Sequence, residues 1–214
     1  MKKLFVLLTI VLSLVPLSTA QTKLRPGFSF GLKGGLNIAD FSGADVDLAF
    51  QTKVGLAAGG FLTYRLGDIL AIQAEILYTQ KGAKIFAQVQ GTALSEWLNL
   101  NYIEIPLLFK FYPPLDSAIR PMFFAGPYVA FKSSFKDKWE YGELSGNDDV
   151  TAFRERETGF AAGGGLDFPV GKGMRMSAEI RYSRGLSTLS KNAAEKGYNA
   201  VFAVLVGIAF GKKG

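Results

Sequence analysis

The amino-acid sequence predicts an all-β protein, an eight-stranded antiparallel up-and-down transmembrane β-barrel. Three observations lead to this fold class. Eight segments alternate apolar with polar or small residues, which is typical of strands that separate two different environments. Each segment has roughly 10–13 residues, whereas a tilted membrane-crossing strand needs about 9–11 and a strand of a soluble protein averages about 5–6. Short and long connections also alternate along the chain.

The chain begins with a segment typical of a secretory signal peptide. Two lysines precede an apolar run in residues 4–17, and small residues lead up to Ala20. The apolar run is short for a membrane-spanning helix, which needs about 20 residues. We expect residues 1–20 to be removed by cleavage after Ala20, and residues 21–214 to form one domain.

The composition excludes several classes of function. The 214 residues carry a formal net charge of +6 without any run of basic residues, so a nucleic-acid partner is not expected. The absence of cysteine excludes disulfides and a cysteine-linked lipid anchor. Histidine, the commonest metal ligand and general base, is also absent. We therefore expect no cofactor and no metal site.

The alternation is clearest in the segment "NYIEIPLLFKFY". Ile103 and Ile105 share one face of this strand, and Glu104 lies on the opposite face. The same pattern recurs along the chain, in softer form where glycine is abundant. The eight predicted strands lie in residues 27–39, 53–66, 69–81, 101–112, 119–131, 158–170, 175–184 and 199–210.

The connections between these strands fall into two classes. Three are tight and lie near residues 66–68, 113–117 and 171–173. Four are long and polar and cover roughly residues 40–52, 82–97, 133–156 and 185–198. Transmembrane barrels have short periplasmic turns and longer extracellular loops in this alternating order.

Aromatic residues near strand ends agree with a barrel in a membrane, because amphipathic rings collect at the two membrane interfaces. The residues expected in these aromatic girdles are Tyr64, Tyr78, Trp97, Tyr112, Tyr128, Tyr182 and Tyr198.

The polar face is predicted to line the barrel interior. This face is rich in glycine, as at Gly59 and Gly163, and an eight-stranded barrel has room inside only for side chains. On a face exposed to water the same glycines would weaken the strands without benefit. The opposite face is bulky and continuously apolar, as contact with lipid requires.

Charged residues of both signs lie on the predicted inner face. An unpaired ion buried there would cost several kcal/mol, so we expect these charges to pair and to plug the barrel. A proton or ion path is the alternative interpretation. The predicted interior polar network consists of Lys33, Glu75, Glu104, Lys110, Asp167, Arg175, Glu179 and Arg181.

Pro106 interrupts the strand predicted in residues 101–112. Proline lacks the N–H group that a strand with two neighbours would use. We therefore expect a β-bulge at Pro106.

Several motifs together resemble a known family. "YIEIPLLFKFY" resembles the fourth-strand motif of the outer-membrane β-barrel domain family of Bacteroidota, also called the porin family. "FGLKGGLNIADFSG", "FFAGPYVAF" and "EIRYSRGLSTL" resemble its first, fifth and seventh strands. The chain is more distantly similar to OmpA- and OmpX-type eight-stranded barrels. The resemblance covers nearly the whole mature chain, and it implies a Gram-negative outer-membrane location and insertion by the barrel assembly machinery.

The last predicted strand resembles the signal that this machinery reads. Apolar residues alternate up to the aromatic Phe210. The sequence departs from the family pattern in one respect, because "GKKG" follows Phe210 and the aromatic residue is not terminal.

The long connection in residues 133–156 is the predicted region of interaction, because exposed loops on a rigid scaffold often carry binding function. Its acidic residues resemble no EF-hand spacing, so a solvated loop is expected rather than a calcium site. Membrane lipid, including lipopolysaccharide, is the expected partner, and a specific protein or ligand is left open. The candidate interaction residues are Trp139, Tyr141, Asp148 and Asp149.

We expect a structural or interaction barrel and not an enzyme. Small outer-membrane barrel enzymes use a catalytic histidine, as the resemblance to such barrels implies, and this chain has none. The glycines at 163–165 lack the lysine and the following helix of a phosphate-binding loop. Two alternatives remain: a narrow porin or small-solute channel, and a secreted soluble barrel that binds an apolar ligand.

Overall fold

The computed structural model describes residues 26–42, 50–89, 92–115, 117–141, 144–149, 154–188 and 198–211. The predicted signal peptide, residues 1–20, lies outside the described residues. The strands are β1 (Gly27–Ser42), β2 (Phe50–Arg65), β3 (Leu70–Val89), β4 (Thr92–Phe111), β5 (Arg120–Tyr141), β6 (Leu144–Asp149), β7 (Arg156–Gly171), β8 (Met174–Gly185) and β9 (Tyr198–Gly211).

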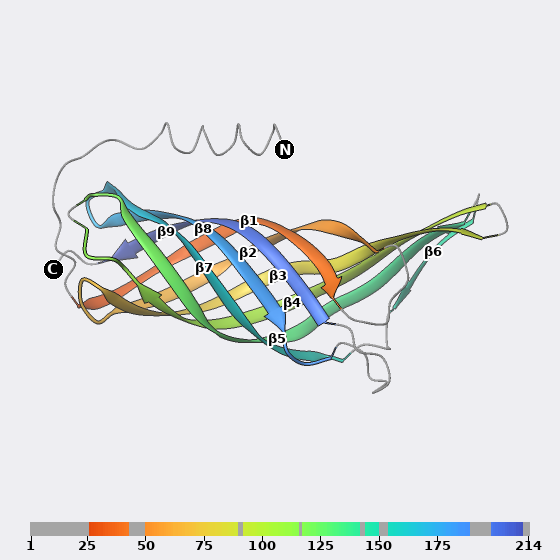
Figure 1. Ribbon diagram of the computed structural model, residues 1–214, viewed down its shortest axis with the longest axis horizontal. Coiled ribbons are helices and arrows are strands. Elements are labelled where there is room, and N and C mark those ends of the chain that lie inside the picture. The colour runs from red at the N-terminus through yellow and green to blue at the C-terminus, as the bar shows by residue number, and fades with distance from the viewer. Residues whose placement is uncertain are drawn as a thin grey trace.

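Eight of these strands close into an antiparallel barrel (Figure 1). The pairing order is β4-β3-β2-β1-β9-β8-β7-β5, and β4 also pairs with β5, which closes the ring. The first and last strands are joined over a long register, from Ser29 opposite Gly211 to Ser42 opposite Tyr198. The predicted eight-stranded antiparallel barrel is therefore confirmed. β6 is a short addition that pairs with β5 outside the ring.

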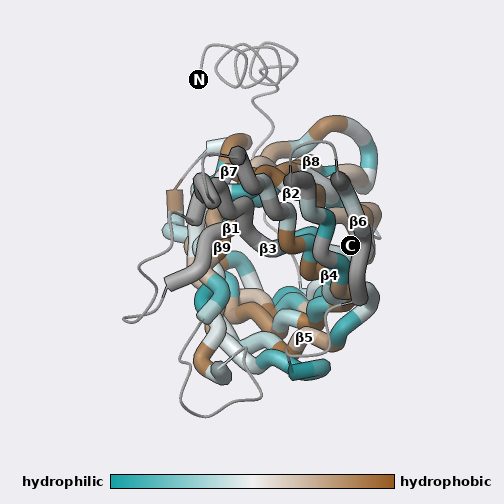
Figure 2. The backbone as a smooth tube through the Cα atoms, turned by 90° about the vertical axis from the view of Figure 1, so that its right-hand side faces the viewer, coloured by the Kyte–Doolittle hydropathy of each residue, from teal (hydrophilic) through white to brown (hydrophobic). Residues whose placement is uncertain are grey.

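Alternation along each strand separates the two faces of the barrel wall. Polar and apolar residues alternate along the backbone in an end-on view (Figure 2). On β3, Glu75 is 1% exposed and the adjacent Ile76 is 62% exposed. A soluble barrel needs the opposite arrangement, with apolar residues inside, so the interpretation as a soluble barrel with an apolar ligand is wrong.

The three predicted tight turns lie together at one end of the barrel, here called the turn end. They join β2 to β3, β4 to β5, and β7 to β8. In the last of these turns Gly173 has a φ of 75°, a conformation that residues with a Cβ rarely adopt. The sequence "GKG" is therefore what permits a two-residue connection there.

The opposite end, here called the hairpin end, differs from the prediction. Residues 82–97 were predicted to be a long loop, but β3 and β4 continue as a paired hairpin from Val89 opposite Thr92. Residues 133–156 contain the end of β5 and all of β6 instead of only a loop. The barrel strands are 12–22 residues long, not 10–13. Alternation continues in these extensions, where Phe135 and Trp139 alternate with Lys136 and Lys138, but the segments are also rich in charged and polar residues, which is typical of loops.

Pro106 does not cause a bulge. The register of β4 against β5 is the same before and after Pro106, from Tyr102 to Phe111, although the ladder skips Leu107 and Leu108. A register shift lies instead between Asn101 and Tyr102, opposite Ser133 of β5. Pro106 is tolerated without an extra residue because the β3–β4 ladder skips its position between Ala74–Leu107 and Leu77–Glu104.

Two aromatic residues expected in the girdles point inward instead. Tyr112 and Tyr128 are only 2% and 3% exposed. Tyr64, Tyr78 and Tyr182 face outward as expected. No helix among the described residues is long and apolar enough to cross a membrane.

Candidate functional site

The candidate functional site is the polar interior of the barrel. Its buried charges form three groups, each named here by its position along the barrel axis. The central network consists of Lys33, Glu75, Lys110, Glu179 and Arg181. The hairpin-end network consists of Lys81, Glu104 and Glu157. The turn-end network consists of Arg65, Asp167 and Arg175.

Two carboxylates hold three cations in the central network. Lys33 Nζ lies 2.8 Å from Glu75 Oε1 and 2.7 Å from Glu179 Oε2. Arg181 donates to both oxygens of Glu75, at 2.8 and 2.9 Å, the bidentate geometry that makes arginine–carboxylate pairs strong. Lys110 Nζ binds the remaining oxygen of Glu179 at 3.0 Å. Strands far apart in the chain are thereby connected across the lumen.

The hairpin-end network has the opposite excess of charge, with one cation and two carboxylates. Lys81 Nζ lies 2.7 Å from Glu104 Oε2 and 3.1 Å from Glu157 Oε1. The hydroxyl group of Tyr128 and the amide of Asn199 donate hydrogen bonds to Glu157. These donors stabilise the Glu157 carboxylate, because its cation, Lys81, is shared with Glu104.

Arginines dominate the turn-end network. Asp167 accepts hydrogen bonds from Arg65 Nη2 and Arg175 Nε, each at 2.9 Å. The Arg65 guanidinium lies 4.6 Å from the ring centroid of Tyr112, just beyond the end of β4. Burial, with a smaller contribution from Asp167, raises the pKa of Tyr112 to about 12. Arg120 also faces this ring and donates to the carbonyl oxygen of Asp68.

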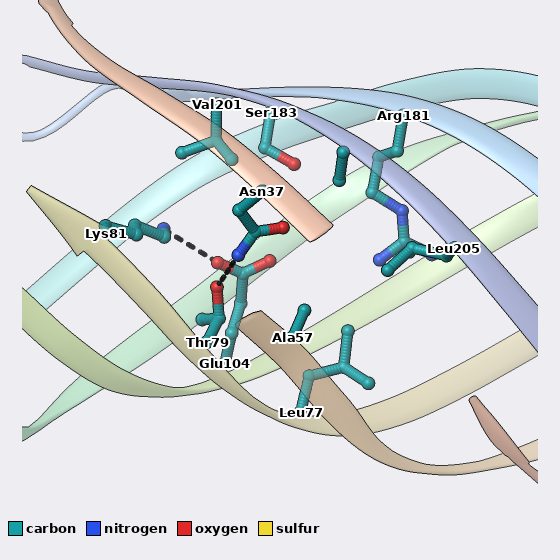
Figure 3. Close-up of a pocket in the computed structure, with 11 residues that line it drawn as sticks. Asn37, Ala57, Leu77, Thr79, Lys81, Glu104, Arg181, Ser183, Val201 and Leu205 are labelled. Carbon is teal, nitrogen blue, oxygen red and sulfur yellow. Dashed lines mark hydrogen bonds and ion pairs between the residues drawn. The ribbon is translucent and has the colours of Figure 1, made fainter. Parts of the chain in front are cut away.

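A small cavity lies where the central and hairpin-end networks meet. Its volume is about 10 Å³, roughly the space of one water molecule. Arg181 of the central network and Glu104 of the hairpin-end network both line it, and Asn37 donates a hydrogen bond of 2.7 Å to Thr79 in its wall (Figure 3). The excess positive charge on one side of the cavity therefore faces the excess negative charge on the other.

All eight residues predicted for the interior network lie in the lumen, in three groups rather than one. Glu104 belongs to the hairpin-end network, and Asp167 and Arg175 belong to the turn-end network. The other five make up the whole of the central network: Lys33, Glu75, Lys110, Glu179 and Arg181.

Sequence reasoning missed three charged partners, Lys81, Glu157 and Arg65. Lys81 and Arg65 share the inward parity of their strands and could have been included on that signal. Glu157 has the same parity as Gly159 and Gly163, but it lay at the edge of the predicted 133–156 loop. The true start of β7 at Arg156 places it in the barrel wall.

The predicted interaction residues lie on strands instead of in a loop. The indole ring of Trp139 on β5 covers Gly146 of β6, so closely that a Cβ on Gly146 would lie 2.6 Å from the ring. Tyr141 pairs through its backbone with Leu144. Asp148 and Asp149 belong to β6, and their side chains lie outside the described residues, as does that of Tyr141. Among the side chains that the structure describes, no cluster of acidic residues could hold a metal ion.

A closed barrel with charges in its lumen and apolar residues on its outer wall is a transmembrane β-barrel, since closure satisfies every backbone group without an exposed edge. The sequence matches the family model described as outer membrane protein beta-barrel domain over residues 19–191, and the chain belongs to that family. It is an outer-membrane β-barrel protein. No curated protein sequence matches it significantly.

Solved outer-membrane barrels are similar to this chain in fold. A major outer membrane protein from Thermus thermophilus is 10% identical, with a TM-score of 0.50 over 86% of this chain and 99% of that one. OprG from Pseudomonas aeruginosa is 12% identical, with a TM-score of 0.48 over 89% and 98%. Ail of Yersinia pestis is 13% identical, with a TM-score of 0.45 over 87% and 100%. At these identities the similarity concerns the fold alone.

Proposed function

We propose that this protein is a sealed outer-membrane scaffold that holds an extended β-sheet outside the membrane for interaction. It is neither an enzyme nor a solute channel in this proposal. The observation that carries it is the burial of the central network. The side chains of Lys33, Glu75, Lys110, Glu179 and Arg181 are at most 3% exposed.

Burial bears on conduction because a channel must be lined by surface that water can reach. A lumen wide enough for a solute would leave its charged walls hydrated, as in the larger porins. Here the carboxylates of Glu75 and Glu179 are fully occupied by cations. Conduction would require these ion pairs to separate inside a narrow barrel, where an unpaired charge costs several kcal/mol.

The extended sheet supports the interaction role. β3, β4 and β5 continue well past the barrel wall and are joined there by β6 (Figure 1). The sheet is paired throughout, so it presents a preformed surface instead of a mobile loop, which lowers the entropy cost of binding. Trp97 and Trp139 lie on it, and Lys138 Nζ lies 5.2 Å from the ring centroid of Trp97. The interaction role predicted for a loop in residues 133–156 is therefore proposed for this paired sheet.

The remaining expectations about the protein's surroundings are part of the same proposal. The signal peptide would be cleaved after Ala20 during export, and the barrel assembly machinery would engage β9 through its last aromatic residue, Phe210. Lipopolysaccharide is the proposed lipid partner. A Bacteroidota origin is supported by the sequence motifs of the first, fourth, fifth and seventh strands.

Planar-bilayer recording of the purified protein tests the sealed lumen. We expect no conductance steps above leak for the wild-type barrel. The double variant Glu75→Ala/Arg181→Ala removes a bidentate pair from the central charged layer and should introduce small, reproducible steps. Tyr182→Ala removes a large side chain from the outer wall and serves as the matched control, with no steps expected.

Reproducible wild-type steps that the two interior substitutions alter would contradict the proposal and favour the narrow channel. A heat-dependent shift in gel migration verifies that each variant is a folded barrel before recording.

A further inference from the structure

Two arginines face outward at the hairpin end of the barrel wall. Arg156 on β7 and Arg184 on β8 are exposed, while Glu157 and Ser183 beside them are buried in the lumen. Alternation along the strand therefore directs both guanidinium groups to the surroundings of the barrel. Their position differs from that of Arg65, Arg175 and Arg181, which pair with carboxylates inside.

The depth of Arg184 places it at the edge of the apolar band. It lies ten residues along β8 from Met174 at the turn end. At a rise of about 3.3 Å per residue and a strand tilt of about 40°, that distance corresponds to about 25 Å along the barrel axis, the usual height of the lipid-facing band. Arg184 pairs with Phe160 across the strands, and Arg156 lies four residues farther along β7 from Phe160. Arg184 therefore lies at the level of the lipid headgroups, and by the same measure Arg156 lies about 10 Å farther out along the barrel axis.

Aromatic side chains lie beside Arg184: Phe160 is directly opposite it on β7, and Tyr182 is two residues nearer the turn end on β8. Phe160 and Tyr182 are 47% and 46% exposed on the same outer face. The Arg156 guanidinium lies 5.6 Å from the ring centroid of Phe131. On the other side of Arg184, β9 contributes the small residue Ala200. Within the described part of the chain the Arg184 side chain makes no hydrogen bond or ion pair, and the exposed Glu155 directly precedes Arg156.

The turn end shows no such outward charge in the described residues. Its outer wall carries aromatic residues, among them Phe28, Tyr64 and Phe111. The exposed Asp68 and Lys172 lie in turns there and have opposite signs. The basic character is thus confined to the hairpin end, which corresponds to the outer leaflet in an outer-membrane barrel.

We propose that Arg156 and Arg184 form a binding site for the phosphate groups of lipopolysaccharide in the outer leaflet. A guanidinium presents a planar fork of donors that matches phosphate. Near the interface an arginine on the lipid side costs little, and an anionic headgroup satisfies it. Phe160 and Tyr182 would contact the upper acyl chains of the bound lipid. The assignment rests on the proposed outer-membrane role with lipopolysaccharide as the lipid partner, and it is independent of whether the lumen conducts.

Titration of the folded protein in zwitterionic detergent tests the site. The probes are lipopolysaccharide and the same lipopolysaccharide after chemical dephosphorylation. Arg184→Gln should weaken binding of the intact lipid roughly fivefold, the contribution of one basic residue at an anionic surface, and Arg156→Gln/Arg184→Gln should weaken it by roughly tens of fold. Lys172→Gln removes one exposed charge at the turn end and should change binding less than about twofold.

Two further measurements separate specific recognition from general attraction. Arg156→Lys/Arg184→Lys keeps the charge without the fork and should bind between the wild type and the double glutamine variant. Dephosphorylated lipid should bind the wild type no better than intact lipid binds the double glutamine variant. Equal binding of the two lipids, wild-type affinity in the double variant, or an equal loss in Lys172→Gln would each overturn the proposal.

Discussion

Glu179 is the residue on which the central network depends most. It contacts Lys33, Lys110 and Arg181, and its two oxygens are divided between them. Glu75 can hold Lys33 and Arg181 without it, but within the described residues Lys110 has no other carboxylate partner. Loss of the Glu179 charge would therefore leave one buried ammonium group without a counterion.

We expect Glu179→Gln to lower the free energy of unfolding by about 3–5 kcal/mol, the usual cost of breaking a buried ion pair from one side. Lys110→Met removes the orphaned charge with a side chain of similar shape. The double variant should therefore lose less than the sum of the two single losses, by about 1–3 kcal/mol. Urea unfolding in detergent micelles measures all three.

The exposed substitution Glu155→Gln controls for loss of a carboxylate as such and should stay within about 0.5 kcal/mol of the wild type. Additive losses in the double variant would show that Lys110 and Glu179 are not coupled.

At the scale of elements, inward glycines pair with inward aromatic residues on neighbouring strands. Gly163 of β7 lies opposite Phe124 of β5, and Gly31 of β1 lies opposite Phe61 of β2. In each pair the ring covers the glycine at a distance that leaves no room for a Cβ. At these two positions the ring requires glycine, and so does a still closer backbone carbonyl oxygen, that of Ile208 for Gly31 and that of Ile180 for Gly163.

Gly163→Ala should destabilise the barrel by about 1–3 kcal/mol, the typical cost of overpacking. Its Cβ would lie closest to the carbonyl oxygen of Ile180, and it would also lie 2.7 Å from Phe124 Cζ. The adjacent Gly164 faces outward, and its Cβ would lie 3.2 Å from the nearest atom, the carbonyl oxygen of Met122.

Gly164→Ala is the matched control, and we expect it to be close to neutral. Thermal unfolding followed by gel migration compares the two. Equal losses at the neighbouring positions would refute close packing by Phe124 and Ile180 as the reason for Gly163.

At the scale of the whole molecule, a sheet exposed on the cell surface requires the hairpin end to face outside and the turn end to face the periplasm. Ser145 on β6 is exposed at the hairpin end, and Ser117 is exposed in the connection from β4 to β5 at the turn end. The chain contains no cysteine, so single-cysteine variants give no background labelling.

Ser145→Cys should react with a membrane-impermeant maleimide on intact cells, whereas Ser117→Cys should react only after the outer membrane is permeabilised. The two substitutions are chemically the same and differ only in position along the barrel axis. The reverse labelling pattern would show that the hairpin end faces the periplasm.

The barrel architecture could be predicted from the sequence because each strand in the membrane has one face toward lipid and one face toward the polar lumen. Apolar and polar residues alternate accordingly. Glu104 and Lys110 were placed in the lumen, and Ile105 and Phe109 on the lipid side, by parity alone. The turn at Gly173 was likewise readable from local composition. Where the strands continue past the barrel wall, charged and polar residues are frequent, as in the β5 segment from Lys132 to Glu140. The sequence therefore predicts loops in the extensions of β3, β4 and β5, although one face of them buries Leu98, Leu100 and Phe135.

The tertiary structure alone decided which charges meet. Lys33 and Glu179 are 146 residues apart, and their contact depends on barrel closure and on the stagger between strands, which parity does not specify. The tertiary structure also places Tyr128 inside the barrel, where its hydroxyl group donates to Glu157. It accommodates Pro106 in β4 without a bulge. The sequence by itself determined which side of each strand faces lipid, because that choice is a local balance of transfer free energies. The pairing of interior charges was left to the tertiary structure, because it depends on distances between strands far apart in the chain.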